Sequence, residues 1–155
     1  MDNAPDIINA QVIPDTYNQF WVDISSHIEG MNPLDTLVIS LPLETGGPAE
    51  AQLVKMLQAC QLAPGSYNLL QLKPEDQIAW HQLRDSLKPK NIVLLGVSAE
   101  QLGIGIYFMP HQVNRFNDRS WIPTLSVPEL EQQPDIKKHL WNYGLKPVFV
   151  EKVYG

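Results

Sequence analysis

Three short apolar runs, separated by segments with helical spacing, are the feature that most limits how this chain can fold. The runs cover residues 36–41, 67–72 and 91–95, and they are rich in the aliphatic and β-branched residues of buried strands. Residues 48–62 and the stretch that begins at Pro74 carry apolar residues at helical spacing instead. Strands that alternate with helices are typical of a parallel sheet covered on both faces. The pattern predicts an α/β fold, a three-layer α/β/α sandwich with a mainly parallel central sheet.

The rest of the chain extends this alternation. We expect a short helix over residues 98–102, one or two strands within 103–123, a last helix over 134–143, and a strand or tail over 146–150. Central strands of parallel sheets are covered on both faces, which predicts a group of buried residues at the centre. That group is Leu37, Val38, Ile39, Val93, Leu94 and Leu95.

Composition is that of a single globular domain spanning residues 1–155, with the sandwich over residues 36–143. Apolar residues make up 44% of the chain and the net charge is −6. Lys and Arg are scattered, and an acidic protein without a basic face predicts weak or no direct nucleic-acid binding. No apolar run approaches the roughly 20 residues that a membrane span needs, and the N-terminus has no signal-peptide pattern. We therefore expect a cytoplasmic protein that does not enter the membrane.

The first 30 residues form a separate helical and aromatic segment. Tyr17, Phe20 and Trp21, followed by two isoleucines, recur at helical spacing after a possible N-cap at Asp15. Two interpretations stay open for this segment. It is either a helix packed on the core or an arm whose Tyr17, Phe20 and Trp21 bind a partner protein.

Generic motifs give no support to a cofactor, a metal or a nucleophile. Gly103-Ile-Gly105 lacks the third glycine of a dinucleotide-binding loop. Ser98 follows a strand, as in a nucleophile elbow, but Glu100 stands where the second glycine is needed. The four histidines have no metal-pair spacing, and Cys60 is the only cysteine, so we predict a buried thiol and neither cofactor nor metal.

Several segments resemble the bacterial uracil-DNA glycosylase superfamily. Residues 49–62 and 67–74 look like its early helix and second strand, and residues 91–103 resemble the strand, glycine and helix that follow. Residues 125–141 are similar to its C-terminal segment. There Leu130, Pro134, Lys137 and Trp141 keep the spacing of a family motif.

Departures from the family pattern fall at the positions that the resemblance assigns to chemistry. The family histidine falls at Ser126, and the base-reading asparagine falls near Leu70. The loop after the first strand has no Asp, and Glu44 is its only acid. Flipping a base and hydrolysing its bond to the sugar requires a polar group that positions water and a donor to the leaving base. These three degenerate positions, Glu44, Leu70 and Ser126, predict a protein without catalytic residues.

A non-catalytic family of similar fold, the psi subunits of bacterial DNA polymerase III, resembles the chain more closely. Psi subunits carry a Leu-Gln-Leu-Thr-Pro-Glu pattern, and residues 70–75 here read Leu-Gln-Leu-Lys-Pro-Glu. The resemblance implies a bacterial replication protein whose N-terminal segment contacts the clamp loader and whose domain holds a chi-like subunit. Two alternatives remain: a divergent base-excision glycosylase that uses Glu44 or Glu50, and a glycosylase-shaped binding domain unrelated to replication.

Overall fold

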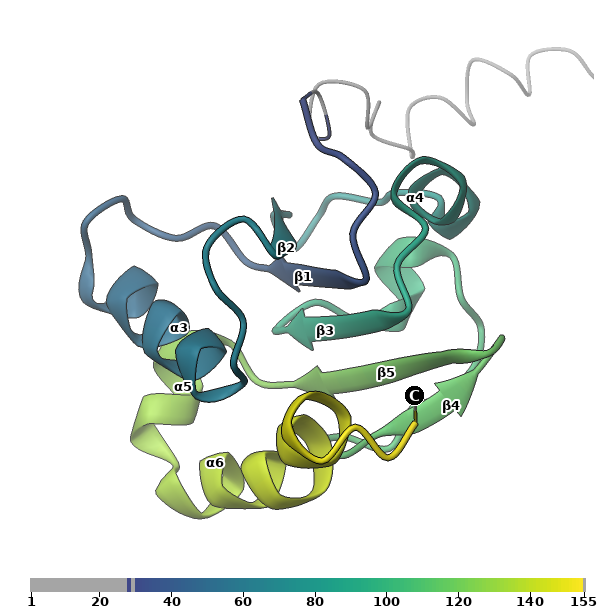
Figure 1. Ribbon diagram of the computed structural model, residues 1–155. Coiled ribbons are helices and arrows are strands. Elements are labelled where there is room, and N and C mark those ends of the chain that lie inside the picture. Colours follow the sequence, from purple (N-terminus) through teal and green to yellow (C-terminus); the bar gives the residue numbers. More distant parts are fainter. Residues whose placement is uncertain (1–27, 29, 155) are drawn as a thin grey trace, which may run out of the picture.

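The computed structural model describes residue 28 and residues 30–154, which build an α/β fold around one sheet (Figure 1). The elements before the C-terminal helices are β1 (Thr36–Ser40), α3 (Pro48–Ala59), β2 (Tyr67–Gln71), α4 (Trp80–Leu87), β3 (Asn91–Leu95), η2 (Ala99–Leu102), β4 (Asn114–Phe116) and β5 (Arg119–Thr124). The chain then continues through α5 (Val127–Gln132), α6 (Pro134–Leu140) and η3 (Trp141–Val150).

The sheet is mostly parallel and has five strands in the order β2-β1-β3-β5-β4. β1 pairs with β2 and β3, and β3 pairs with β5, all in parallel, whereas β4 is antiparallel to β5. The three strands predicted from apolar runs are confirmed to within a residue at their ends. The strand-rich part of residues 103–123 is a hairpin, β4–β5. Its turn residues Asn117 and Asp118 have φ values of 58° and 57°, as two-residue hairpin turns require.

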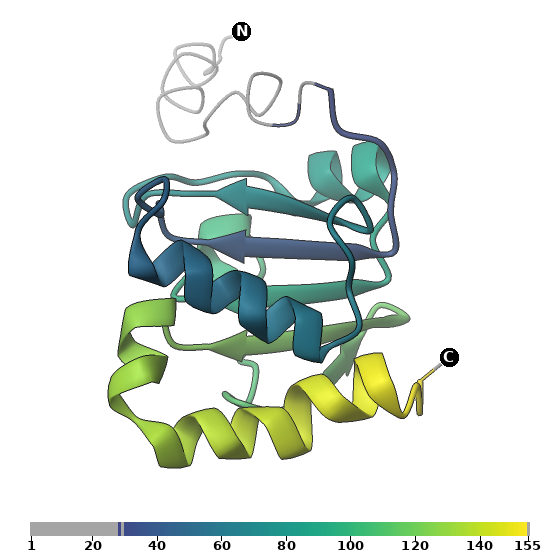
Figure 2. The same ribbon diagram turned by 60° about the vertical axis from the view of Figure 1, so that its left-hand side comes forward.

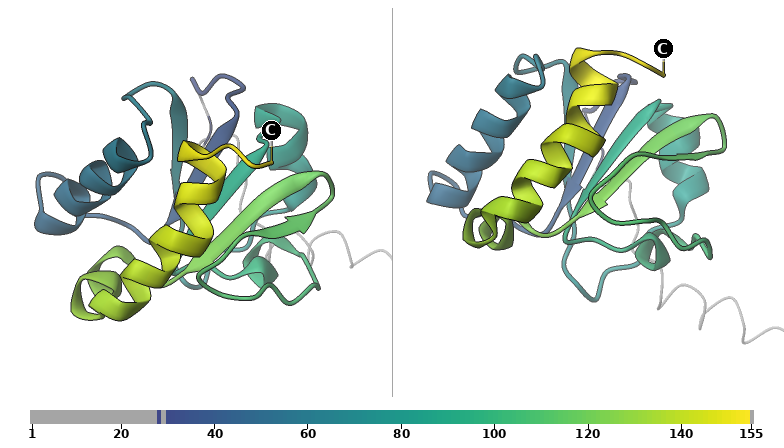
Figure 3. Two further views of the ribbon diagram at one scale, coloured as in Figure 1. Left: turned by 60° about the horizontal axis from the view of Figure 1, so that its bottom comes forward. Right: turned by 90° about the horizontal axis from the view of Figure 1, so that it is seen from below.

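Helices cover both faces of the sheet. Figures 2 and 3 show α3 and the C-terminal helices on one face, while α4 and η2 lie on the other. Alternate residues of β1 pack on opposite faces of the sheet. Leu37 and Ile39 belong to the hydrophobic cluster under α4, and Val38 belongs to the cluster under α3. All six residues predicted to form the centre are at most 1% exposed. This arrangement is compatible with the predicted three-layer α/β/α sandwich.

Helix α4 begins at Trp80, not at Pro74 as predicted. The intervening backbone is held by other partners: Lys73 N–H donates to Asp76 Oδ2 at 3.0 Å, and Ile78 N–H donates to Gln101 O at 2.8 Å. The Gln101 amide also donates to the carbonyls of Lys73 and Asp76. These bonds hold residues 73–78 outside the helix, with a turn at residues 74 and 75, and α4 therefore begins only at Trp80.

The predicted strand or tail over residues 146–150 is wrong, because η3 continues the helix that α6 begins. Leu145, Val148 and Phe149 are buried at helical spacing against the sheet. η3 has wide π-helical turns, in which Glu151 N–H donates to the carbonyl of Lys146, five residues earlier. Pro147 lies inside it. Burial of this apolar stripe explains why the segment packs as a helix.

Candidate functional site

A crevice lies at the carboxyl ends of β1 and β3. The loops that follow these two neighbouring strands leave toward opposite faces of the sheet, to α3 and to η2. Such a switch point is where open α/β sheets bind their ligands. A cavity of about 270 Å³ occurs there. Its lining residues are Ser40, Leu41, Pro42, Leu43, Glu44, Ala49, Leu95, Ser126, Val127 and Pro128.

Two of the three degenerate glycosylase positions, Glu44 and Ser126, meet in this crevice, from the β1–α3 loop and from the start of α5. Leu70 does not. It is 1% exposed in β2, beside Ile39, and it packs in the cluster between the sheet and α4. The position that the resemblance assigns to base reading is therefore part of the hydrophobic core.

Ser126 is the N-cap of α5. Its Oγ donates to Glu129 Oε1 at 2.9 Å and accepts from Glu129 N–H at 3.4 Å. The backbone N–H of Ser126 donates to the same carboxylate oxygen at 3.1 Å. This reciprocal arrangement is a capping box, which satisfies amide groups at the start of the helix. The hydroxyl is thus engaged in local structure.

The acids near the crevice have different environments. Glu50 Oε1 accepts a hydrogen bond from Gly46 N–H at 2.9 Å, so its carboxylate holds the β1–α3 loop. Glu44 is exposed, and it is the only ionisable side chain among the described residues that line the cavity. The hydroxyl of Ser40 donates to the carbonyl of Leu41. The described lining of the crevice is therefore mostly apolar, with one exposed carboxylate, that of Glu44.

His111 is a feature that the sequence did not reveal. Its backbone has a left-handed φ of 64°, its N–H donates to Pro123 O at 2.7 Å, and its Nδ1 lies 2.9 Å from Thr124 Oγ1. Burial, and then the charge of His139, lower the pKa of His111. The ring fastens the loop before β4 onto the end of β5. No spacing in the sequence marks it, because its partners are distant along the chain.

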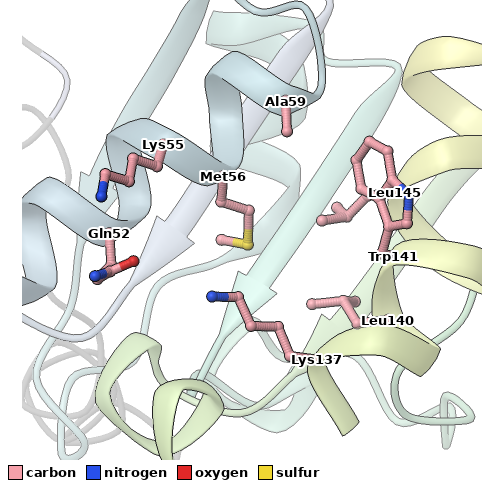
Figure 4. Close-up of a pocket in the computed structure, with 8 residues that line it drawn as sticks. All are labelled: Gln52, Lys55, Met56, Ala59, Lys137, Leu140, Trp141 and Leu145. Atoms are coloured by element: carbon pink, nitrogen blue, oxygen red, sulfur yellow. The ribbon is translucent and has the colours of Figure 1, made fainter. Parts of the chain in front are cut away.

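A second hollow lies on the face of α3 and the C-terminal helices (Figure 4). It measures about 290 Å³. Four large apolar side chains line it, those of Met56, Leu140, Trp141 and Leu145, and Gln52, Lys55, Ala59 and Lys137 complete its lining. We call it the α3–α6 groove. The sequence placed Lys137 and Trp141 in one motif but gave no sign that α3 lies opposite them.

Tyr17, Phe20 and Trp21 lie outside the described residues. Within residue 28 and residues 30–154, no group of three or more His, Cys, Asp and Glu side chains gathers as metal ligands would. The helices of that same part of the chain are too short or too polar to cross a membrane.

The fold and its crevice define an α/β protein with a mostly parallel five-stranded sheet and a switch-point cavity. No known family model matches the chain, and no curated protein matches it either.

Proposed function

We propose that this chain is a non-catalytic protein-binding subunit with a uracil-DNA glycosylase type of sandwich, similar to the psi subunit of the bacterial replicative polymerase. The observation that carries the proposal is the structural role of two of the degenerate glycosylase positions. Leu70 is a core residue and Ser126 is a helix cap. Both positions serve the folding of the domain.

The chemistry of the crevice argues against base excision. Hydrolysis of a glycosidic bond needs one group to position water and a donor to stabilise the departing base. Glu44 is available for the first task, but the Ser126 hydroxyl already donates to Glu129. The other side chains of the described lining are aliphatic or proline, apart from Ser40, whose hydroxyl donates to a backbone carbonyl.

Exposed apolar groups support the binding part of the proposal. The loop before β4 exposes Ile106, Tyr107 and Met109, with 80% of Tyr107 accessible to solvent. The backbone of Met109 is held by the side chain of Asn114, which accepts a hydrogen bond from Met109 N–H and donates one to Met109 O. A loop that presents several large apolar side chains to solvent is typical of a protein–protein contact.

One experiment tests the absence of catalysis. The purified protein is incubated with single- and double-stranded DNA that contains uracil, and released uracil is measured against a buffer control. We expect no release. Turnover that Glu44→Gln or Glu50→Gln abolishes would overturn the proposal in favour of a divergent glycosylase.

A second experiment tests the partner. The full chain is mixed with the purified clamp loader and chi subunit of its own organism and analysed by size-exclusion chromatography. We expect co-elution that is lost when residues 1–30 are removed. Absence of co-elution would favour a glycosylase-shaped binding domain unrelated to replication.

The aromatic segment needs its own control. If Trp21 is a partner anchor, Trp21→Ala weakens binding by about 2 kcal/mol or more and leaves the melting temperature unchanged. If it belongs to the core, the same change costs roughly 3–5 kcal/mol of stability. A thermal melt and a binding measurement on one Trp21→Ala preparation separate the two interpretations.

A further inference from the structure

The α3–α6 groove is apolar in its depth and basic at its rim. Leu140 and Leu145 are buried, while Met56 and Trp141 are half-buried and face the hollow from α3 and η3. Figure 4 shows Met56, Leu140 and Trp141 around the same space, with the ammonium group of Lys137 below Met56. Part of the tryptophan and part of the methionine therefore line the hollow among the described residues.

The described lining of the groove carries lysines and no acid, in contrast to the net negative charge of the whole chain. The whole chain carries 17 Asp and Glu against 11 Lys and Arg. The described lining of the groove instead contains two lysines, Lys55 and Lys137, and no acid. Lys137 is paired with Glu131, which lies on α5. This pair holds the lysine at the rim, and the exposed Lys55 lines the groove from α3.

The size and walls of the groove indicate the shape of its ligand. At about 290 Å³ it is slightly smaller than the ~300–1,000 Å³ of most small-molecule sites. Its two walls are helices, α3 and the continuous α6–η3 helix (Figure 4). A hollow of this kind accepts a few apolar side chains from one face of an amphipathic helix that lies along it.

We propose that the α3–α6 groove binds an acidic amphipathic helical segment of a partner protein. Its apolar face contacts Met56, Leu140 and Trp141, one of its acidic residues pairs with Lys55, and another shares Lys137 with Glu131. This inference rests on the proposed protein-binding function and names the chemistry of the partner. Since the protein as a whole is acidic, attraction of an acidic segment depends on these two lysines, and it weakens with salt.

The experiment is a selection from a random-peptide phage library on the immobilised full-length protein. We expect enrichment of peptides with apolar residues at helical spacing and with Asp or Glu between them. Synthetic versions of the enriched peptides then give affinities by fluorescence anisotropy. Enrichment of basic or uncharged peptides, or no enrichment at all, would overturn the proposal.

Matched variants locate the binding. Lys55→Glu combined with Lys137→Glu should lower the affinity for the selected peptides by about tenfold or more. Lys73→Glu combined with Lys90→Glu makes the same change in charge at exposed positions outside the groove and should leave affinity within about twofold. Equal losses in both double variants would show a general charge effect and contradict a groove site.

A steric variant tests the groove without removing Trp141, whose side chain packs against the core. Ala59 is exposed at the end of α3 and lines the groove, so Ala59→Trp fills the hollow without removing a packed side chain. We expect it to abolish binding at an unchanged melting temperature. Binding that survives in the folded Ala59→Trp protein would contradict the proposal.

The two proposals fail separately. Clamp-loader co-elution without peptide selection would contradict the groove alone, whereas selected acidic peptides without co-elution would contradict the replication role alone.

Discussion

Gly96 and Ser126 lie so close together that a methyl group on Gly96 would come within 3.0 Å of Ser126 Cβ. The same methyl group would meet Leu41 Cδ1 at 3.0 Å, and Gly96 has a φ of 77°. Gly96 therefore packs so closely against two lining residues of the crevice, Leu41 and Ser126, that an added carbon would have to displace them.

Gly96→Ala is the first prediction that follows. A side chain here is strained by the positive φ and by both contacts, so we expect the free energy of unfolding to fall by more than about 1 kcal/mol. Gly105→Ala is the control, because a Cβ there meets nothing within 4 Å. Urea unfolding of both variants checks this. Equal free energies of unfolding for the two variants would mean that Leu41 and Ser126 move aside at little cost.

Ser126→Ala tests the structural role of the degenerate histidine position. The change removes both hydrogen bonds that Oγ makes with Glu129, and loss of an N-cap costs about 1 kcal/mol. Urea unfolding measures the loss. Ser86→Ala is the control, since Ser86 is exposed inside α4, where Ala is favourable. If Ser126→Ala left the free energy of unfolding unchanged, the main physical reason for regarding this serine as structural would be removed.

His111 should make stability depend on pH. Its pKa in the folded protein lies below the ordinary 6.5, so the unfolded chain binds more protons as the pH falls through that value. The free energy of unfolding should therefore decrease from pH 7 toward pH 5, and His111→Asn should reduce that decrease. Asn suits the positive φ at this position. Denaturant unfolding of both proteins at the two pH values measures the difference, and identical decreases would contradict it.

Cys60 should react with thiol reagents only when the protein opens. Burial raises the pKa of its thiol to about 12, and the residue, which directly follows α3, is 1% exposed. Because the thiolate is the reactive form, we expect native labelling by a disulfide reagent to be far slower than labelling in urea. Similar rates in both conditions would mean that the end of α3 separates readily from the sheet.

Local signals in the sequence were sufficient for the central strands and for α3. Residues such as Val38 and Val93 belong to uninterrupted apolar runs, which identify strands covered on both faces. Pro48 was a reliable start of α3 because its missing N–H costs nothing at the first helical turn. These features depend only on near neighbours in the chain.

The errors involve partners that are distant in sequence. Pro74 offered the same starting signal as Pro48, but Gln101 holds the backbone near it in a turn. In the crevice, Glu44 and Ser126 were identified from the family pattern, yet only the fold shows that Leu70 faces away from them. The α3–α6 groove could not be predicted, since it needs the relative placement of helices about eighty residues apart.

The short antiparallel strand β4 has a consequence for how the molecule behaves at high concentration. It forms one edge of the sheet, and it contains only three residues, Asn114–Phe116. The side-chain amide of Asn114 donates to the backbone carbonyls of Met109, Gln112 and Trp121. A neighbouring molecule would find few backbone groups in register along such a strand. This edge therefore resists the strand-to-strand polymerisation that long, flat edges invite.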